Sequence, residues 1–145
     1  MGMSSNAIER IIIEVICNKI GFNNQAGGFL TSGGTLANLT ALLSARKAIT
    51  KKDIWNDGNQ NQLGIMVSEE AHYCVDRAAR IMGLGDQGII KVPVTKDFAM
   101  DTHVLEAKFK EAQESGIEVF AIIGSAPSTA TGIFDNLECI SEFAQ

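Results

Sequence analysis

The first group of residues suited to chemistry is Gly33-Gly34-Thr35, which lies between an apolar segment and a predicted helix. Glycine has no Cβ, so its backbone N–H can approach a ligand closely. The first N–H groups of the helix lie at the positive end of its dipole, where anions bind. This geometry suits a phosphate. A tight turn that serves only packing is an equal alternative, because the P-loop lysine and the GxGxxG spacing are both absent.

A histidine, His72, is the second candidate. It follows the predicted strand 63–68 and lies near the start of the next predicted helix. Open parallel sheets bind their ligands at the carboxyl edge, where this residue would stand. An imidazole at that edge can stack on a flat ring or relay a proton. Taken singly, His72 is better explained as a solvent-facing residue with a local hydrogen bond.

The third candidate is a loop of small and hydroxyl residues over 125–132, which follows the predicted strand 119–124. It therefore reaches the same edge of the sheet as His72. Serine, threonine, proline and glycine are common in loops for conformational reasons alone, and this explains most of the segment. Ser125, the first residue beyond the strand, is the one we expect to bind a polar group of a ligand.

Other reactive side chains have simpler explanations. Two acids, Glu69 and Glu70, are expected near a helix start because of the dipole. His103 lies on a predicted surface helix, which favours a structural role. The three cysteines are widely separated and form no CxxC pair, so we expect no metal site.

The elements that must position these residues alternate along the chain. Apolar residues at helical spacing predict helices over 7–20, 35–49, 71–84 and 100–112, with a last helix capped by Asp135 and running through Ile140. Short apolar runs predict strands over 28–31, 63–68, 89–94 and 119–124, and the polar segment 51–62 predicts a loop. This alternation indicates the α/β class, with a mostly parallel sheet covered by helices.

The composition restricts the classes of binding partner and the cellular compartment that we expect. The 145 residues suffice for one domain with a core, and the formal net charge of -5 argues against nucleic acid and anionic membrane as partners. The longest apolar runs are too short to cross a bilayer, and no secretory signal opens the chain. An odd number of cysteines suits reduced thiols, so we expect a cytoplasmic protein. The sequence ends in an apolar helix, and we expect it to be a piece of a longer protein.

Taken together and in this order, Gly33-Gly34-Thr35, Ala71-His72 and Ser125 resemble the group II pyridoxal-phosphate-dependent amino acid decarboxylases. That family includes the aromatic amino acid, glutamate, cysteine sulfinate and diaminobutyrate decarboxylases. The resemblance extends from about Ser4 to Gln145. Its most specific segments are GGFLTSGGTLANLTALLSAR at 27–46, SEEAHYCVDRAARIMGLG at 68–85 and TGIFDNLECI at 131–140. It implies that residues 1–145 form the first part of the large cofactor domain of the aspartate-aminotransferase-like fold, fold type I.

The resemblance also implies roles for single residues. Gly34 and Thr35 would hold the phosphate of pyridoxal 5′-phosphate through backbone N–H groups and the hydroxyl. His72 would stack over the pyridine ring and assist protonation, which makes it the expected catalytic residue. Ser125 stands where the family often has threonine near the polar substituents of the ring. Leu36 departs from the family, because many relatives have an acid there.

Two functional groups of the family have no counterpart in these residues. The aspartate that pairs with the pyridine nitrogen and the Schiff-base lysine would both follow residue 145, and no lysine of this sequence lies in the family's His-Lys context. We therefore expect the chain alone to be inactive, although the parent protein would remove CO2 from an amino acid. The alternatives are an aminotransferase or lyase of the same fold, and a non-catalytic module. The resemblance further implies a homodimer, and the substrate stays open.

Overall fold

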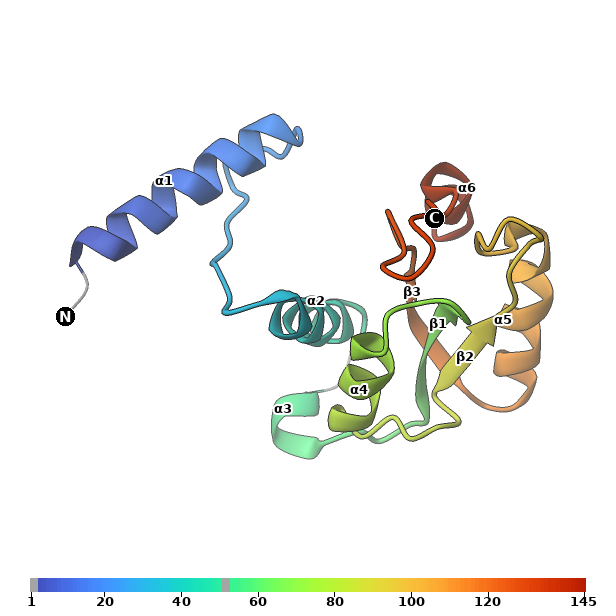
Figure 1. Ribbon diagram of the computed structural model, residues 1–145. Helices are drawn as coiled ribbons and strands as arrows, with labels where there is room; N and C mark the ends of the chain where they lie inside the picture. Colours follow the sequence, from blue (N-terminus) through green and yellow to red (C-terminus); the bar gives the residue numbers. More distant parts are fainter. Residues whose placement is uncertain (1–2, 51–52) are drawn as a thin grey trace. The chain divides into compact units, whose positions relative to one another are not determined.

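The structure is a computed structural model that describes residues 3–50 and 53–145. Figure 1 shows the order of its elements. The helices are α1 (Met3–Lys19), α2 (Gly34–Ile49), α3 (Ile54–Asp57), α4 (Cys74–Ile81), the 3-10 helix η1 (Thr102–Val104), α5 (Leu105–Glu114) and α6 (Leu137–Phe143). The strands are β1 (Leu63–Ser68), β2 (Ile89–Val92) and β3 (Glu118–Ile123). Within the described residues, no helix combines the length and apolar character needed to cross a bilayer.

The chain divides into two compact units, Met1–Ala37 and Asn38–Gln145. In the first unit, α1 is followed by an extended segment that lies against it. The Glu9 carboxylate accepts a hydrogen bond from the backbone N–H of Leu30 at 2.6 Å, and Gly28 lies close to the side chain of Ile13. The predicted strand over 28–31 is wrong, because this segment pairs with no strand among residues 3–50 and 53–145. An apolar run forms a strand only where a neighbour supplies the ladder hydrogen bonds.

The second unit is built on a parallel sheet of order β2-β1-β3. The central strand β1 pairs in parallel with both neighbours, and all six of its residues are buried. A strand covered on both faces reads as a continuous apolar run, which is why LGIMVS is easy to recognise in the sequence. The expected fold class, a parallel sheet covered by helices, is confirmed.

Each face of the sheet has its own core. Alternate residues of β1 point to opposite faces. Leu63, Ile65 and Val67 pack with α2, α3 and α4, whereas Met66 packs with residues of α5 and α6. Figure 1 shows α4 and α5 on opposite sides of the sheet.

Several predicted boundaries shift in the structure. The predicted loop 51–62 contains the short helix α3, and its first residues, Lys51 and Lys52, lie outside the described residues. The last helix is capped by Asn136, whose side-chain oxygen accepts a hydrogen bond from Cys139 N at 3.1 Å. Asp135 was therefore the wrong cap, because its carboxylate binds other backbone groups.

A buried arginine connects α2 to the end of α4. Arg46 is only 8% exposed, and its Nη1 donates to Asn59 Oδ1 at 3.0 Å and to the carbonyl of Met82 at 3.2 Å. The side-chain amide of Asn59 also donates to the Met82 carbonyl, at 3.0 Å. Burial lowers the pKa of the Arg46 guanidinium. Since both acceptors are neutral, this arginine serves as a donor that joins helices and is not part of an ion pair in the described residues.

The glycine before β2 offers a test of the packing. A Cβ at Gly88 would lie 2.5 Å from the Leu63 carbonyl and 2.7 Å from the Leu84 carbonyl, and backbone atoms cannot move aside cheaply. We expect Gly88→Ala to lower the free energy of unfolding by about 2–3 kcal/mol in urea denaturation, as overpacking does. Gly27→Ala, where a Cβ meets nothing within 4 Å, is the matched control and should change it by less than about 0.5 kcal/mol. Equal stabilities of the two variants would contradict this packing.

Candidate functional site

The carboxyl ends of β1 and β3 meet at one edge of the sheet, since the register pairs Val67 with Ile123. Two of the candidate residues, His72 and Ser125, follow these strands and so come to that edge. A pocket of about 290 Å³ lies there, between the segment after β1 and the loop after β3. Its lining residues are Glu69, Glu70, Ala71, His72, Tyr73, Thr129 and Ala130.

The imidazole of His72 lines this pocket and is exposed to it. Its Nδ1 accepts a hydrogen bond from the backbone N–H of Cys74 at 3.2 Å. An accepting nitrogen carries no proton, so the neutral ring holds its proton on Nε2. The ring of Tyr73 lies beside it, with centroids 4.4 Å apart and planes tilted by 37°. His72 therefore presents a ring face and an Nε2–H donor.

The predicted helix around His72 is shorter than expected. Helix α4 begins at Cys74, and a turn stabilised by Ser68 precedes it. The backbone N–H of Glu70 donates to the Ser68 hydroxyl at 3.2 Å, and the N–H of Ala71 donates to the Ser68 carbonyl at 3.1 Å. His72 consequently sits on a turn between strand and helix and not inside a helix.

The loop after β3 is held against this turn by a long-range contact. Ser128 is buried, and its hydroxyl donates to the carbonyl of Glu70 at 3.4 Å. This contact brings Thr129 and Ala130 beside His72 in the pocket. Sequence reasoning missed Thr129 and treated it as ordinary loop. The sequence could have indicated Thr129 only as a hydroxyl residue in the loop after β3, which reaches the edge of the sheet where His72 lies.

Ser125 lies at this edge but is not among the residues that line the pocket. It is half-buried, and its hydroxyl makes no hydrogen bond to another residue in the described part of the chain. Its backbone is fixed on both sides by Asp135, which accepts from Ser125 N at 2.7 Å and donates from its own N–H to the Ser125 carbonyl at 2.9 Å.

Gly34 and Thr35 belong to the first unit and open helix α2 as the sequence predicts. The carbonyl of Gly33 accepts hydrogen bonds from Leu36 N and Ala37 N, both at 3.1 Å, which makes Gly33 the residue before the helix. A Cβ at Gly33 or Gly34 would meet nothing within 4 Å. Packing among the described residues therefore does not require a glycine at either position.

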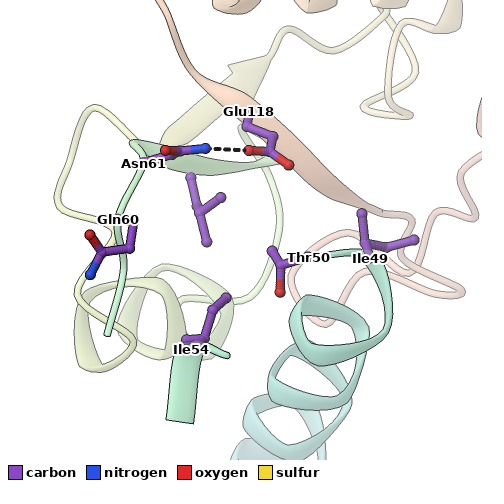
Figure 2. A pocket seen from close by; sticks show the side chains of 7 residues that line it. Ile49, Thr50, Ile54, Gln60, Asn61 and Glu118 are labelled. Carbon is purple, nitrogen blue, oxygen red and sulfur yellow. Dashed lines mark hydrogen bonds between the residues drawn. The ribbon is translucent and has the colours of Figure 1, made fainter. Parts of the chain in front are cut away.

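A second pocket, of about 320 Å³, lies at the opposite end of the sheet (Figure 2). Leu63 and Glu118, the first residues of β1 and β3, line it together with Ile49 and Thr50 from the end of α2. The carboxylate of Glu118 already accepts a hydrogen bond within this pocket, from Asn61 Nδ2 to Oε2 at 3.0 Å. None of the predicted site residues lies in this pocket, so the chemistry is better sought at the carboxyl edge.

Comparison with known proteins identifies the family. The profile of the pyridoxal-dependent decarboxylase conserved domain matches residues 6–145. The chain belongs to this family. The matched range includes the candidate phosphate-binding turn, His72 and the loop after β3, and the family agrees with the resemblance found in the sequence.

Individual relatives agree with this assignment. The chain is 35% identical over 120 residues to a glutamate decarboxylase-like protein of Gibberella zeae, covering 83% of this chain and 23% of the relative. It is 30% identical over 141 residues to an aromatic-L-amino-acid decarboxylase of Bacillus atrophaeus, covering 97% of this chain and 28% of the relative. The glutamate decarboxylase domain of a diaminobutyrate-pyruvate transaminase and L-2,4-diaminobutyrate decarboxylase from Vibrio parahaemolyticus superposes with a TM-score of 0.89 at 30% identity, covering 97% of this chain and 32% of that one. The chain thus spans about a quarter to a third of the length of these proteins.

The hydrogen bond to His72 predicts a measurable tautomer. At about pH 9, long-range ¹H–¹⁵N spectra should show His72 with its proton almost wholly on Nε2. His103 is the internal control, because its ring makes no hydrogen bond among the described residues, whereas its backbone N–H donates to Asp101 Oδ1. It should show the mixture of tautomers that a solvated ring adopts. A His72 ring protonated at Nδ1 would contradict the observed contact.

Proposed function

We propose that this chain forms the part of a pyridoxal-phosphate-dependent amino acid decarboxylase that binds the phosphate and one face of the pyridine ring. The match of the decarboxylase domain over residues 6–145 carries the proposal. In this assignment residues 1–145 belong to one cofactor domain. When bound, pyridoxal phosphate withdraws electrons from the α-carbon of an amino acid, which lets the carboxyl group leave as CO2.

The residues present fit this cofactor. Gly34 and Thr35 offer N–H groups and a hydroxyl at the start of a helix of 16 residues, and no packing among the described residues requires a glycine at position 34. His72 offers an exposed ring face at the carboxyl edge of the sheet, where such sheets bind ligands. Ser125 offers a hydroxyl with no partner among the described residues. In this proposal Gly34 and Thr35 bind the phosphate, His72 stacks on the ring and holds a proton at Nε2, and Ser125 binds a polar substituent.

The substrate class is an amino acid, and its identity stays open. Relatives of similar identity are named for glutamate, aromatic amino acids and 2,4-diaminobutyrate, so overall similarity favours none of the three. An aminotransferase or lyase of the same fold has less support, because the matching domain is a decarboxylase domain. In a protein that joins this chain to the aspartate and lysine elements, carboxyl-labelled amino acids should release labelled CO2. Transfer of the amino group without CO2 release would favour the alternative.

Two further features belong to the proposal. We infer a cytoplasmic protein, and the support is that Cys17, Cys74 and Cys139 are all free. We also infer a homodimer, and the support is an apolar stripe along α1. Its members are spaced by three and four residues, and each is at least 38% exposed: Ile8, Ile11, Ile12, Val15 and Ile16. A second copy of the chain would bury this stripe.

The phosphate assignment is testable on the chain itself. Pyridoxine 5′-phosphate is a suitable probe, because it lacks the aldehyde that would react with surface lysines. In an NMR titration we expect shifts at the backbone amides of residues 33–36 and near His72, and much smaller shifts with pyridoxine. Thr35→Val should weaken binding about tenfold, the usual effect of losing one hydrogen bond to a charged group.

Two variants separate this effect from a general loss of structure. Gly34→Ala should weaken binding while leaving the melting temperature unchanged or slightly higher, since a Cβ there meets nothing in the free chain and alanine favours helix. Thr102→Val is the matched control for Thr35→Val and should bind like the wild type. Equal binding of pyridoxine and its phosphate would refute the phosphate assignment.

The dimer has its own test. Ile12→Glu places a charge in the middle of the apolar stripe and should shift the chain from dimer to monomer in sedimentation equilibrium at about 10–100 µM. Asn6→Glu adds the same charge elsewhere on α1 and should leave the dimer intact. A wild-type chain that sediments as a monomer over this range would refute the assignment of the stripe to a second copy.

A further inference from the structure

Asp135 is a buried carboxylate at the carboxyl edge of the sheet, and no role is yet assigned to it. It is 7% exposed, and each of its oxygens accepts one backbone hydrogen bond. Oδ2 accepts from Ser125 N and Oδ1 accepts from Met100 N, both at 2.7 Å. Asp135 forms no ion pair with a basic side chain of residues 3–50 and 53–145. Its charge is therefore balanced by peptide N–H groups.

Asp135 holds Ser125 from both sides. Besides accepting from Ser125 N, it donates its own backbone N–H to the Ser125 carbonyl at 2.9 Å. Hydrogen bonds to a carboxylate are shorter and stronger than those between neutral groups. With the N–H and the C=O of Ser125 both engaged, only the rotation of its side chain remains free. The hydroxyl that the proposed function assigns to the cofactor ring is thus carried on a fixed backbone.

The neighbouring residues leave little room for this backbone to move. A Cβ at Gly124 would lie 2.7 Å from the Leu137 side chain and 3.0 Å from that of Ile140, so the chain before Ser125 runs close against α6. Met100, the other donor to Asp135, pairs with Val94 in an antiparallel bridge. Asp135 thus joins the end of β3 to the segment 94–100 and to the start of α6.

We propose that Asp135 is a positioning residue, which orders Ser125 for its contact with the polar substituents of the cofactor ring. This inference rests on the proposed function, since it needs Ser125 to touch the cofactor. It predicts that the carboxylate acts through Ser125, so the effects of changing the two residues should not add.

Asp135→Asn is the main test, because it keeps the shape but leaves one acceptor oxygen and turns an amide NH₂ toward a backbone N–H. The amide of Ser125 should exchange with solvent at least about tenfold faster, while the amides of β1 keep their protection. The dissociation constant for pyridoxine 5′-phosphate should rise about three- to tenfold. Asp53→Asn is the control, since Asp53 also accepts a hydrogen bond, from Asn56 Nδ2, but its neighbour Ile54 lines the pocket at the opposite end of the sheet. It should alter neither quantity.

A double-variant cycle distinguishes positioning from general support. Ser125→Ala should raise the dissociation constant for pyridoxine 5′-phosphate about as much as Asp135→Asn does. The double variant, which carries both substitutions, should have a dissociation constant no higher than the higher of the two single variants. Additive losses, unchanged binding in Asp135→Asn, or an undisturbed Ser125 amide in that variant would each overturn the inference. A wild-type chain in which pyridoxine 5′-phosphate shifts no resonance near Ser125 would instead refute the proposed function, and the positioning role with it.

Discussion

The parallel pairing of β1 with both of its neighbours is the constraint on which the second unit depends. It aligns the carboxyl ends of the strands, so the segments that follow β1 and β3 must leave the sheet at the same edge. His72 and the loop after β3 meet there because of this register and not because of their separation in the sequence. The contact between the Ser128 hydroxyl and the Glu70 carbonyl then holds the two segments together and forms the pocket.

The sequence was sufficient to predict a helix or strand where the local residue pattern agrees with the tertiary environment. The strand β1 and the helix α2 were predicted almost to the residue, because a doubly covered strand is apolar throughout and α2 has a glycine start and a helical apolar period. The strand expected over 28–31 failed for lack of a partner strand. Asp135 and Asn136 are both good capping residues, and only the position of Ser125 and Met100 decides that Asn136 caps the helix.

The residues of the candidate site also divide into those that the sequence indicates and those that only the fold reveals. Gly34, Thr35, His72 and Ser125 stand out by their residue types and by their places at the ends of predicted elements, and the resemblance then implied a role for each. The family of that resemblance is the one to which the chain belongs. Thr129 and Glu70 could not be chosen in this way, because their part in the pocket depends on a contact between residues 58 positions apart. Local composition carries no information on such a contact. The folded loop shows it, because the Ser128 hydroxyl lies within hydrogen-bond distance of the Glu70 carbonyl.

The buried guanidinium of Arg46 has a consequence for how the second unit responds to its surroundings. Its acceptors are an amide oxygen and a peptide carbonyl, so neither loses a charge in mild acid. Ionic strength also has little effect on a contact without an opposite charge and shielded from water. The connection of α2 to the end of α4 should therefore persist through changes of pH and salt that loosen surface ion pairs such as that between Arg80 and Asp86.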